Sequence, residues 1–483
     1  MSDYKQILIK GEYIMNFLNV KNSKIIDSKG NEVFLRGVCL GGWMNMENFI
    51  TGYTGSESSL RKTCKEILGE KKYLFLFNRL LDYFITEDDI SFIKSCNATA
   101  IRVPFNYRHF EDDAKPFFWL KEGFKRLDRI LKLAEKYSLY VILDFHAVQG
   151  CQNHGWHSDN PDHVNYFWQH PHFQDRFISL WEEIASYYAK NPVVAGYDIM
   201  NEPSSSNPYL INKIYKRTIK AIRKKDKKHI IFIEGDNYSG SFNKLEDLSG
   251  TNIAMSSHIY PPPCLQNFKY PGTFEGKLWN RDSLEDLVIK SEAFKYHKKT
   301  KMPWWIGEFG VSFNSNQKEI PSRLKALDDL LGIFNERKLH WTYWTYKDVG
   351  VMGWVMTSPE SKYIKLLKPL LKAKEYFRTD LWMDWLPDTK PVFLVKEIFD
   401  EIKKVLPDFK IEGEYWERKN LQEATLCNHL GKLFQRYFAY LFKDKKEDEI
   451  EDILQSFHFK ECVINKELIT VIKKHQYLEF EIL

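Results

Sequence analysis

The chain has 483 residues, of which 43% are hydrophobic and 15% aromatic, enough for one large catalytic domain with added elements or for two domains. Its 70 basic and 65 acidic residues nearly balance, and no basic stripe argues for a nucleic-acid partner. No run of 18 or more apolar residues is present, so we expect no membrane span. No secretory signal is visible, and the seven cysteines are scattered without CxxC spacing, which predicts reduced thiols in a cytoplasmic protein.

Short apolar runs alternate with helical patterns along most of the chain. Residues 24–32 predict a hairpin whose turn lies at residues 28–31. Eight later runs predict buried strands, at residues 33–38, 98–103, 139–145, 193–200, 230–234, 253–258, 303–308 and 341–344. Helical spacing occurs between them, at residues 74–84, 124–137, 173–190, 211–222, 284–297 and 323–337. This alternation predicts an α/β fold of parallel strands closed into a (β/α)₈ barrel.

The pattern changes beyond about residue 406. An amphipathic helix is predicted at residues 424–442, a charged stretch follows at 443–452, and short strand-like runs lie within 461–483. We therefore predict a catalytic barrel domain over residues 1–405 and a small accessory α+β subdomain over 406–483. No residue of the subdomain carries recognisable chemistry.

The fourth predicted strand ends abruptly in the polar pair Asn201 and Glu202, followed by Pro203. Proline cannot extend a strand ladder, and it favours an extended conformation for the residue before it. Parallel barrels keep their chemistry at this carboxyl end of the strands. Polar or aromatic residues follow other predicted strands at the same edge, namely Arg102, His146, His258, Tyr260, Glu308 and Trp344.

Two of these residues are carboxylates that should face each other across the barrel mouth, because Glu202 ends the fourth strand and Glu308 the seventh. Two carboxylates without a serine triad or a metal cluster point to cleavage of a glycosidic bond. A retaining mechanism needs one carboxylate ionised for attack and the other protonated for the leaving oxygen. Arg102 would favour the ionised form of a neighbouring carboxylate, and Tyr260 can donate a hydrogen bond to it.

The segments around these strand ends closely resemble glycoside hydrolase family 5, a broad group that includes cellulases, mannanases and exo-glucanases. The resemblance covers roughly residues 30–350. It rests on Ile101-Arg102-Val103-Pro104, Leu143-Asp144-Phe145-His146, Asn201-Glu202-Pro203, His258-Ile259-Tyr260, Ile306-Gly307-Glu308-Phe309-Gly310 and Trp341 to Trp344. It implies that Glu202 is the acid/base, that Glu308 is the nucleophile and that no metal or other cofactor is needed. The supporting residues that it implies are Arg102, His146, Asn201, His258, Tyr260 and Trp344.

Two loops look like those of the exo-β-glucanase branch of this family. They are Leu40-Gly41-Gly42-Trp43 with Glu47, and Gly150-Cys151-Gln152-Asn153. Glu47 and Asn153 are therefore candidates for the sugar pocket. Long loops after the first and third strands would tend to close a groove into a pocket. We therefore expect a retaining, exo-acting enzyme that releases terminal glucose or mannose from β-linked oligosaccharides or β-glycosides. The segment 154–160 departs from the exo-glucanase pattern and leaves glucose and mannose undecided.

Other functions stay open. An open groove with Trp156 and Trp168 as stacking platforms would make the enzyme endo-acting, and Trp156 is also a candidate substrate-binding residue. A transglycosylase would share the covalent intermediate and differ only in its acceptor. A non-catalytic sugar-binding protein would be free to lose Glu202 or Glu308, and neither is lost.

Several nearby residues receive no catalytic role from the sequence. His154, His157, His163 and Cys151 match no metal-site spacing, so we expect them to line the substrate pocket or to cap the loop and not to bind a metal. Asp144 is assigned a supporting or structural role, since it shares a strand face with His146. Glu234 and Asp236 are assigned no role beyond loop structure. The sequence does not indicate the oligomeric state.

Overall fold

The computed structural model describes residues 15–205, 207–314, 316–380 and 387–476. Within them, eight parallel strands pair in chain order and close into a barrel. They are β3 (Arg36–Cys39), β4 (Ala100–Asn106), β7 (Tyr140–Ala147), β8 (Val194–Asp198), β9 (Ile230–Glu234), β10 (Ile253–His258), β13 (Trp304–Glu308) and β14 (His340–Tyr343). The predicted barrel is confirmed, and each of the eight predicted runs overlaps one of its strands.

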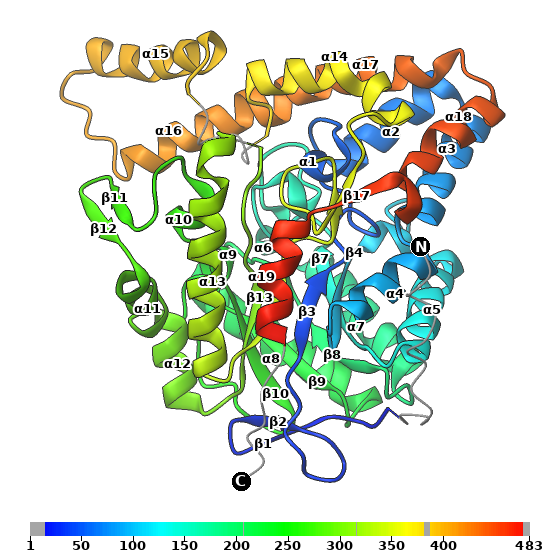
Figure 1. Ribbon diagram of the computed structural model, residues 1–483, viewed down its shortest axis with the longest axis vertical. Helices are drawn as coiled ribbons and strands as arrows, with labels where there is room; N and C mark the ends of the chain where they lie inside the picture. Colours follow the sequence, from blue (N-terminus) through cyan, green and yellow to red (C-terminus); the bar gives the residue numbers. More distant parts are fainter. Residues whose placement is uncertain (1–14, 206, 315, 381–386, 477–483) are drawn as a thin grey trace.

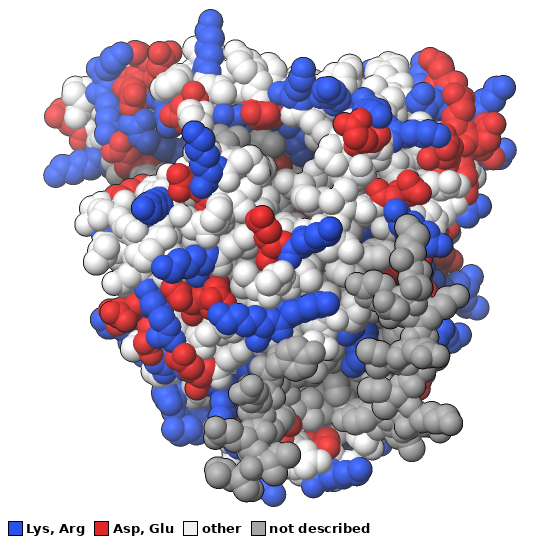
Figure 2. Space-filling model, viewed as in Figure 1, with Lys and Arg blue, Asp and Glu red and all other residues white. Residues whose placement is uncertain are grey.

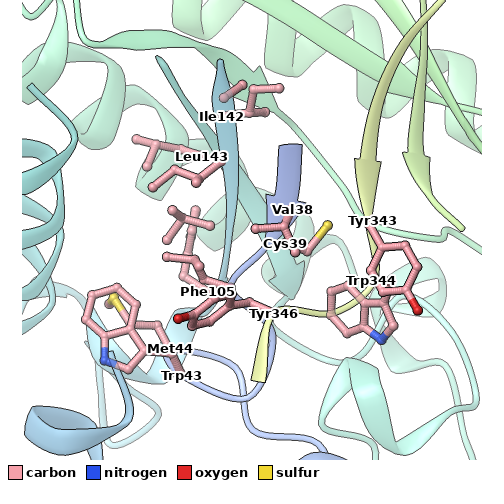
Figure 3. Packing of buried hydrophobic residues seen from close by; sticks show 14 of the residues in the cluster. Val38, Cys39, Trp43, Met44, Phe105, Ile142, Leu143, Tyr343, Trp344 and Tyr346 are labelled. Atoms are coloured by element: carbon pink, nitrogen blue, oxygen red, sulfur yellow. The ribbon is translucent and has the colours of Figure 1, made fainter. Parts of the chain in front are cut away.

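The barrel strands are apolar because both of their faces are buried, one inside the barrel and one against helices. Barrel closure depends on β14 pairing with β3, where Tyr343 lies opposite Val38. Figure 3 shows this region of the core, with Val38 and Cys39 of β3 near Tyr343 and Trp344 at the end of β14.

A hairpin covers the amino-terminal end of the barrel, at the bottom of Figure 1. It pairs β1 (Asn19–Lys21) with β2 (Lys24–Ile26), so its tight turn comes earlier than predicted. The predicted turn at residues 28–31 is nevertheless present, closed by an antiparallel bridge between Ile26 and Glu32.

The outer layer consists of α2 (Glu57–Leu68), α3 (Glu70–Phe84), α4 (Glu87–Ser95), α5 (Lys121–Lys136), α7 (Pro171–Tyr188), α8 (Pro208–Lys225), α11 (Arg281–Ile289), α12 (Glu292–Thr300) and α13 (Ile320–Glu336). The predicted helix 284–297 is divided into α11 and α12, because the Ser291 hydroxyl accepts the Phe294 N–H and caps a new helix. The loops carry short elements, α1 (Asn48–Thr51), α6 (Tyr166–Gln169), α9 (Asp236–Ser239), α10 (Pro262–Leu265), β5 (Glu111–Asp112), β6 (Lys115–Trp119), β11 (Gly272–Phe274) and β12 (Lys277–Trp279).

The C-terminal elements lie in two places on the barrel (Figure 1). They are β15 (Lys347–Asp348), β16 (Val355–Thr357), α14 (Lys362–Phe377), α15 (Lys390–Val405), α16 (Glu414–Gln422), the π-helix η5 (Glu423–Leu430), α17 (Gly431–Lys443), α18 (Glu447–Leu454), β17 (Cys462–Ile464) and α19 (Lys466–Gln476). Helices α14 to α17 lie along the end of the barrel opposite the hairpin, whereas α19 lies beside α13. The predicted domain division at residues 405 and 406 stays a prediction.

The strand-like interpretation of residues 461–483 is wrong for most of the part that the structure describes. Only Cys462–Ile464 forms a strand, which pairs with β16. Residues 466–476 form α19, because Leu468, Ile469 and Ile472 recur at helical spacing and are buried together. Residues 477–483 lie outside the described residues.

In the described ranges, no helix combines the length and hydrophobicity that crossing a bilayer requires. No disulfide bond links the cysteines of the described residues. Figure 2 shows acidic and basic side chains interspersed on the face in view. The cytoplasmic location stays a prediction.

Candidate active site

Glu308, the last residue of β13, is held by two hydrogen-bond donors. Its Oε1 accepts a hydrogen bond from Arg102 Nη1, and its Oε2 accepts one from the Tyr260 hydroxyl at 2.9 Å. Arg102 comes from β4 and is fully buried, so its charge acts in a region that water does not screen. The carboxylate of Glu308 therefore receives one charged and one neutral hydrogen-bond donor.

The guanidinium of Arg102 is also fixed on its other side. Its Nη2 lies 3.1 Å from Asp144 Oδ2, 3.0 Å from Asp198 Oδ2 and 3.3 Å from Glu234 Oε1. It also donates to Asn201 Oδ1 at 2.8 Å. The acidic side chains raise the pKa of Arg102 although burial alone would lower it. Burial and the nearby Glu234 raise the pKa of Asp198. Arg102 therefore keeps a fixed position and a permanent charge.

Glu202 lies between two histidine rings. Its backbone adopts a φ of 44°, and its N–H donates to Glu234 Oε2 at 2.7 Å. Its Oε1 is 2.7 Å from His258 Nδ1, and its Oε2 is 3.1 Å from His157 Nε2. Burial opposes ionisation of Glu202, but these two hydrogen bonds outweigh it and lower its pKa. The expectation that Glu234 only shapes a loop is wrong, because its carboxylate contacts Glu202, Arg102 and His258.

The two candidate catalytic carboxylates lie close together. One oxygen of Glu202, one oxygen of Glu308 and one nitrogen of His258 are all within 4.8 Å of each other. Three such atoms satisfy the spacing for a metal ion, but Arg102 bonds Glu308, and His258 has a raised pKa because Glu234 and Glu308 overcome the effect of burial. Arg102 and a protonated His258 are two positive charges beside the two carboxylates. They stabilise a carboxylate pair and would repel a metal ion.

A second cluster brings together four predicted or supporting residues. His146 lies 2.7 Å from Asp144 Oδ2 through Nδ1 and 3.2 Å from Glu47 Oε1 through Nε2. Burial opposes protonation of His146, but Asp144 raises its pKa to about 10. Its ring stacks on Trp344 with the planes 5° apart and the centroids 5.2 Å apart. A Cβ on Gly41 would come within 2.7 Å of the Trp344 ring, which explains the need for glycine there.

The loop between β7 and α6 carries the candidate residues Asn153 and Trp156, and Trp168 follows in α6. The Asn153 amide donates to the Glu202 carbonyl oxygen at 2.9 Å, so this side chain braces the site. Trp156 and Trp168 are only 4% and 5% exposed, and the Trp168 indole N–H donates to the Gln152 carbonyl oxygen. Neither ring is an open stacking platform in this structure.

The sequence predicted only that His157 lines the substrate pocket or caps the loop, and in the structure it contacts Glu202. The only signal was its place in the segment that departs from the family pattern. His154 and His163 instead face each other, with ring centroids 5.0 Å apart. Among the described residues, these histidines and Cys151 do not gather three ligand atoms at metal spacing.

The C-terminal region contacts the loops around the barrel mouth. Asn428 of η5 donates to the Asn160 carbonyl oxygen at 3.3 Å, and Lys432 of α17 pairs with Asp162 at 2.8 Å. Gln435 of α17 donates to the Thr54 carbonyl oxygen at 2.6 Å. Both long loops, after β3 and after β7, are thus attached to helices that the sequence did not connect with the site.

Comparisons with known proteins agree with this geometry. Residues 67–350 match the family model described as Cellulase (glycosyl hydrolase family 5). A β-xylosidase from Phanerodontia chrysosporium is 36% identical across 93% of this chain and 96% of its own length. Endoglucanase C from Acetivibrio thermocellus is 26% identical across 55% of this chain and 85% of its own length. A solved glycoside hydrolase structure, 20% identical, shares the fold with a TM-score of 0.51 over 70% of this chain and 99% of its own.

Proposed function

The chain belongs to glycoside hydrolase family 5, and within this family we propose that it is a retaining, exo-acting β-glycosidase. The observation that carries the proposal is the close approach of Glu202 and Glu308, whose nearest oxygens lie within 4.8 Å. Retaining enzymes hold their two carboxyl groups about 5–5.5 Å apart, whereas inverting enzymes need about 6.5–9.5 Å for a water molecule.

The surroundings of the two glutamates suit two different tasks. Glu308, held by Arg102 and Tyr260, attacks the anomeric carbon and forms a glycosyl ester while the glycosidic bond breaks. Glu202 gives its proton to the leaving oxygen in that step. It then takes a proton from the water that attacks the same carbon and releases Glu308.

The exo mode is supported by the enclosure of the site. The side chains of Glu202 and Glu308 are only 14% and 7% exposed. Glu47 is buried beside His146, where a carboxylate can bind hydroxyls of a terminal sugar. The loops beyond these residues are tied to η5 and α17 by Asn428 and Lys432, which favours a pocket over a long groove.

The relatives add a candidate for the terminal sugar. The sequence left glucose and mannose open, whereas the relative that matches nearly the whole chain is a β-xylosidase. Its match covers 93% of this chain and 96% of its own length. We therefore propose β-linked xylose as the first glycone to test, with glucose next and mannose after it.

The stereochemistry tests the roles of the two glutamates. An aryl β-glycoside hydrolysed in an NMR tube should first release the β-anomer of the sugar, because two inversions at one carbon restore its configuration. The α-anomer appears later by mutarotation. An α-anomer at the earliest times would rule out double displacement.

Product length tests the exo mode. Aryl β-xylosides, β-glucosides and β-mannosides would identify the glycone, and the matching oligosaccharides should lose one sugar at a time from the non-reducing end. The viscosity of a soluble β-glycan should hardly change while monosaccharide accumulates. A rapid fall in viscosity with little monosaccharide would establish an endoglucanase, the activity that the likeness to Endoglucanase C favours.

A further inference from the structure

A histidine from outside the barrel strands contacts the proposed acid/base. His157 lies on the loop after β7, and its Nε2 is 3.1 Å from Glu202 Oε2. The loop is anchored there, because the Asn45 side chain donates to the His157 carbonyl oxygen at 3.1 Å. The other oxygen of Glu202 is bonded to His258. Both carboxylate oxygens of Glu202 therefore face an imidazole.

The orientation of the Asn153 amide shows which tautomer of His157 the loop favours. Asn153 Oδ1 accepts the Gly155 N–H at 2.9 Å, and Nδ2 donates to the Glu202 carbonyl oxygen at 2.9 Å. These two bonds place the nitrogen of the amide 2.9 Å from His157 Nε2. An amide nitrogen only donates, so it favours a His157 Nε2 that accepts. A neutral Nε2 has one lone pair, which can accept a hydrogen bond either from this amide or from a protonated Glu202.

The charges around this pair favour retention of one proton. Glu47 acts on His157 from the loop after β3, and His146 of β7 lies 6.2 Å away between ring centroids. Tyr238 of α9 lies 6.1 Å from His157 on the other side. Burial opposes a charged His157, but Glu202 and Glu47 outweigh that effect and the repulsion from His146, so the pKa of His157 is raised. Facing Glu202 itself are His258 of β10 and Glu234 of β9.

We propose that His157 is a positioning residue that keeps the catalytic proton beside the acid/base: one proton is shared between His157 Nε2 and Glu202 Oε2, His157 holds it while Glu202 is ionised, and the Asn153 amide facing Nε2 favours its return to Glu202. This inference rests on the proposed role of Glu202. In the first step the proton passes from Glu202 to the leaving oxygen, which leaves a carboxylate and a neutral imidazole. In the second step the attacking water returns one proton to Glu202, and the pair is restored.

Leaving groups that differ in their need for a proton test the proposal. The variants are His157→Ala and His157→Gln, with His154→Gln as a matched control from the same loop whose ring faces His163 instead. For phenyl β-glycosides, which need the proton, kcat/KM should fall at least ~10-fold in both His157 variants. For 2,4-dinitrophenyl β-glycosides, which leave without it, kcat/KM should stay near that of the wild type. Equal losses on both substrates, or full recovery in His157→Gln, would overturn the proposal, because glutamine can hydrogen-bond but cannot hold the proton.

The pH profile gives a second readout with a definite sign. In the wild type the pair keeps its proton to a higher pH than Glu202 could alone, so His157→Gln should move the alkaline limb of kcat/KM to lower pH by ~1 unit or more. If His157 merely donated to an ionised Glu202, its removal would raise the pKa of Glu202 and move the limb to higher pH. An unchanged limb or a shift to higher pH contradicts the proposal.

Glu202→Gln separates this inference from the proposed function. If kcat/KM of that variant falls equally on phenyl and 2,4-dinitrophenyl glycosides, then Glu202 is not the acid/base and both proposals fail. If kcat/KM of Glu202→Gln falls only on phenyl glycosides while the His157 variants keep the wild-type kcat/KM on both substrates, the proposed function stands and the role of His157 is refuted.

Discussion

Single residues distinguish the two carboxylates of the site by their partners. Glu308 is bonded to a guanidinium that three other acidic side chains hold in place, whereas Glu202 is bonded to two imidazoles that can gain and lose protons. A permanent cation suits a nucleophile that stays ionised, and titratable neighbours suit a group that must exchange a proton twice in each cycle.

The first residue-scale prediction concerns Glu308, the proposed nucleophile. Glu308→Gln should lower turnover by several orders of magnitude, because an amide cannot attack the anomeric carbon. Its melting temperature should stay close to that of the wild type, since the amide oxygen still accepts from Arg102 or Tyr260. Steady-state kinetics with thermal denaturation checks both statements. Turnover above a per cent or so of wild type would show that another group is the nucleophile.

The second residue-scale prediction concerns Gly41, which lies against the Trp344 ring that stacks on His146. Gly41→Ala should displace Trp344, because the added Cβ would lie 2.7 Å from both the Trp344 ring and the Thr345 hydroxyl oxygen. We expect a stability loss of ~1–3 kcal/mol and a fall in kcat/KM. Gly250→Ala is the control, since its nearest neighbour would be 3.5 Å away. Equal behaviour of the two variants by thermal denaturation and kinetics would contradict the packing argument.

At the scale of the elements, the pairing of β14 with β3 completes the barrel and contains a buried histidine. The Leu35 N–H donates to His340 Nδ1 at 3.1 Å, just before the paired residues Trp341 and Arg36. Burial, with a smaller effect from Arg36, lowers the pKa of His340 to about 3. The ring is therefore neutral in the fold, and its nitrogen accepts a backbone hydrogen bond.

This lowered pKa predicts a pH dependence of stability. An unfolded histidine gains a proton below its ordinary pKa of about 6.5, whereas His340 in the fold does not. The stability that it contributes is complete above about pH 6.5 and decreases by up to ~1.4 kcal/mol per unit as the pH falls toward the folded value. Denaturant unfolding of the wild type and His340→Asn should show a flatter dependence in the variant between pH 6.5 and 4. If the unfolding free energies of the two proteins run parallel across this pH range, His340 is not a source of the pH dependence.

The strand ends show how far the sequence could predict this site. The carboxyl ends of parallel strands converge, so Arg102, Glu202 and Glu308 could be placed together from the pattern alone. Asp198 lies inside an apolar run, and nothing in the sequence indicates that it turns toward Arg102. The position of His157 depends on the path of a loop, which no periodicity records. Trp156 is buried for the same reason, although its type suits a cleft.

At the scale of the whole molecule, one apolar core runs from the barrel into the C-terminal region. Phe438 and Phe442 of α17 and Leu468 and Ile472 of α19 belong to the same buried cluster as the barrel strands. The Asn335 amide of α13 donates to the His475 carbonyl oxygen at 2.9 Å. These contacts join the barrel to the C-terminal region across the predicted boundary between residues 1–405 and 406–483.

A truncation tests whether that division describes independent units. A chain ending at residue 405 would expose the apolar surface that α17 and α19 cover, so we expect it to unfold at a lower temperature or to aggregate. Thermal denaturation and size-exclusion chromatography of the truncated and full chains provide the comparison. A truncated chain that is monomeric and as stable as the full one would support two separate domains.

The attachment of the loops after β3 and β7 to η5 and α17 also has a consequence for the order of synthesis. Both proposed catalytic glutamates and Arg102 leave the ribosome before residue 309, more than a hundred residues ahead of Asn428, Lys432 and Gln435. The ribosome adds about 5–20 residues per second, and domains generally fold as they emerge. The residues of the acidic centre are therefore synthesised several seconds before the segment that contacts the loops around it, so we expect the site to gain its full enclosure only after α17 has been made.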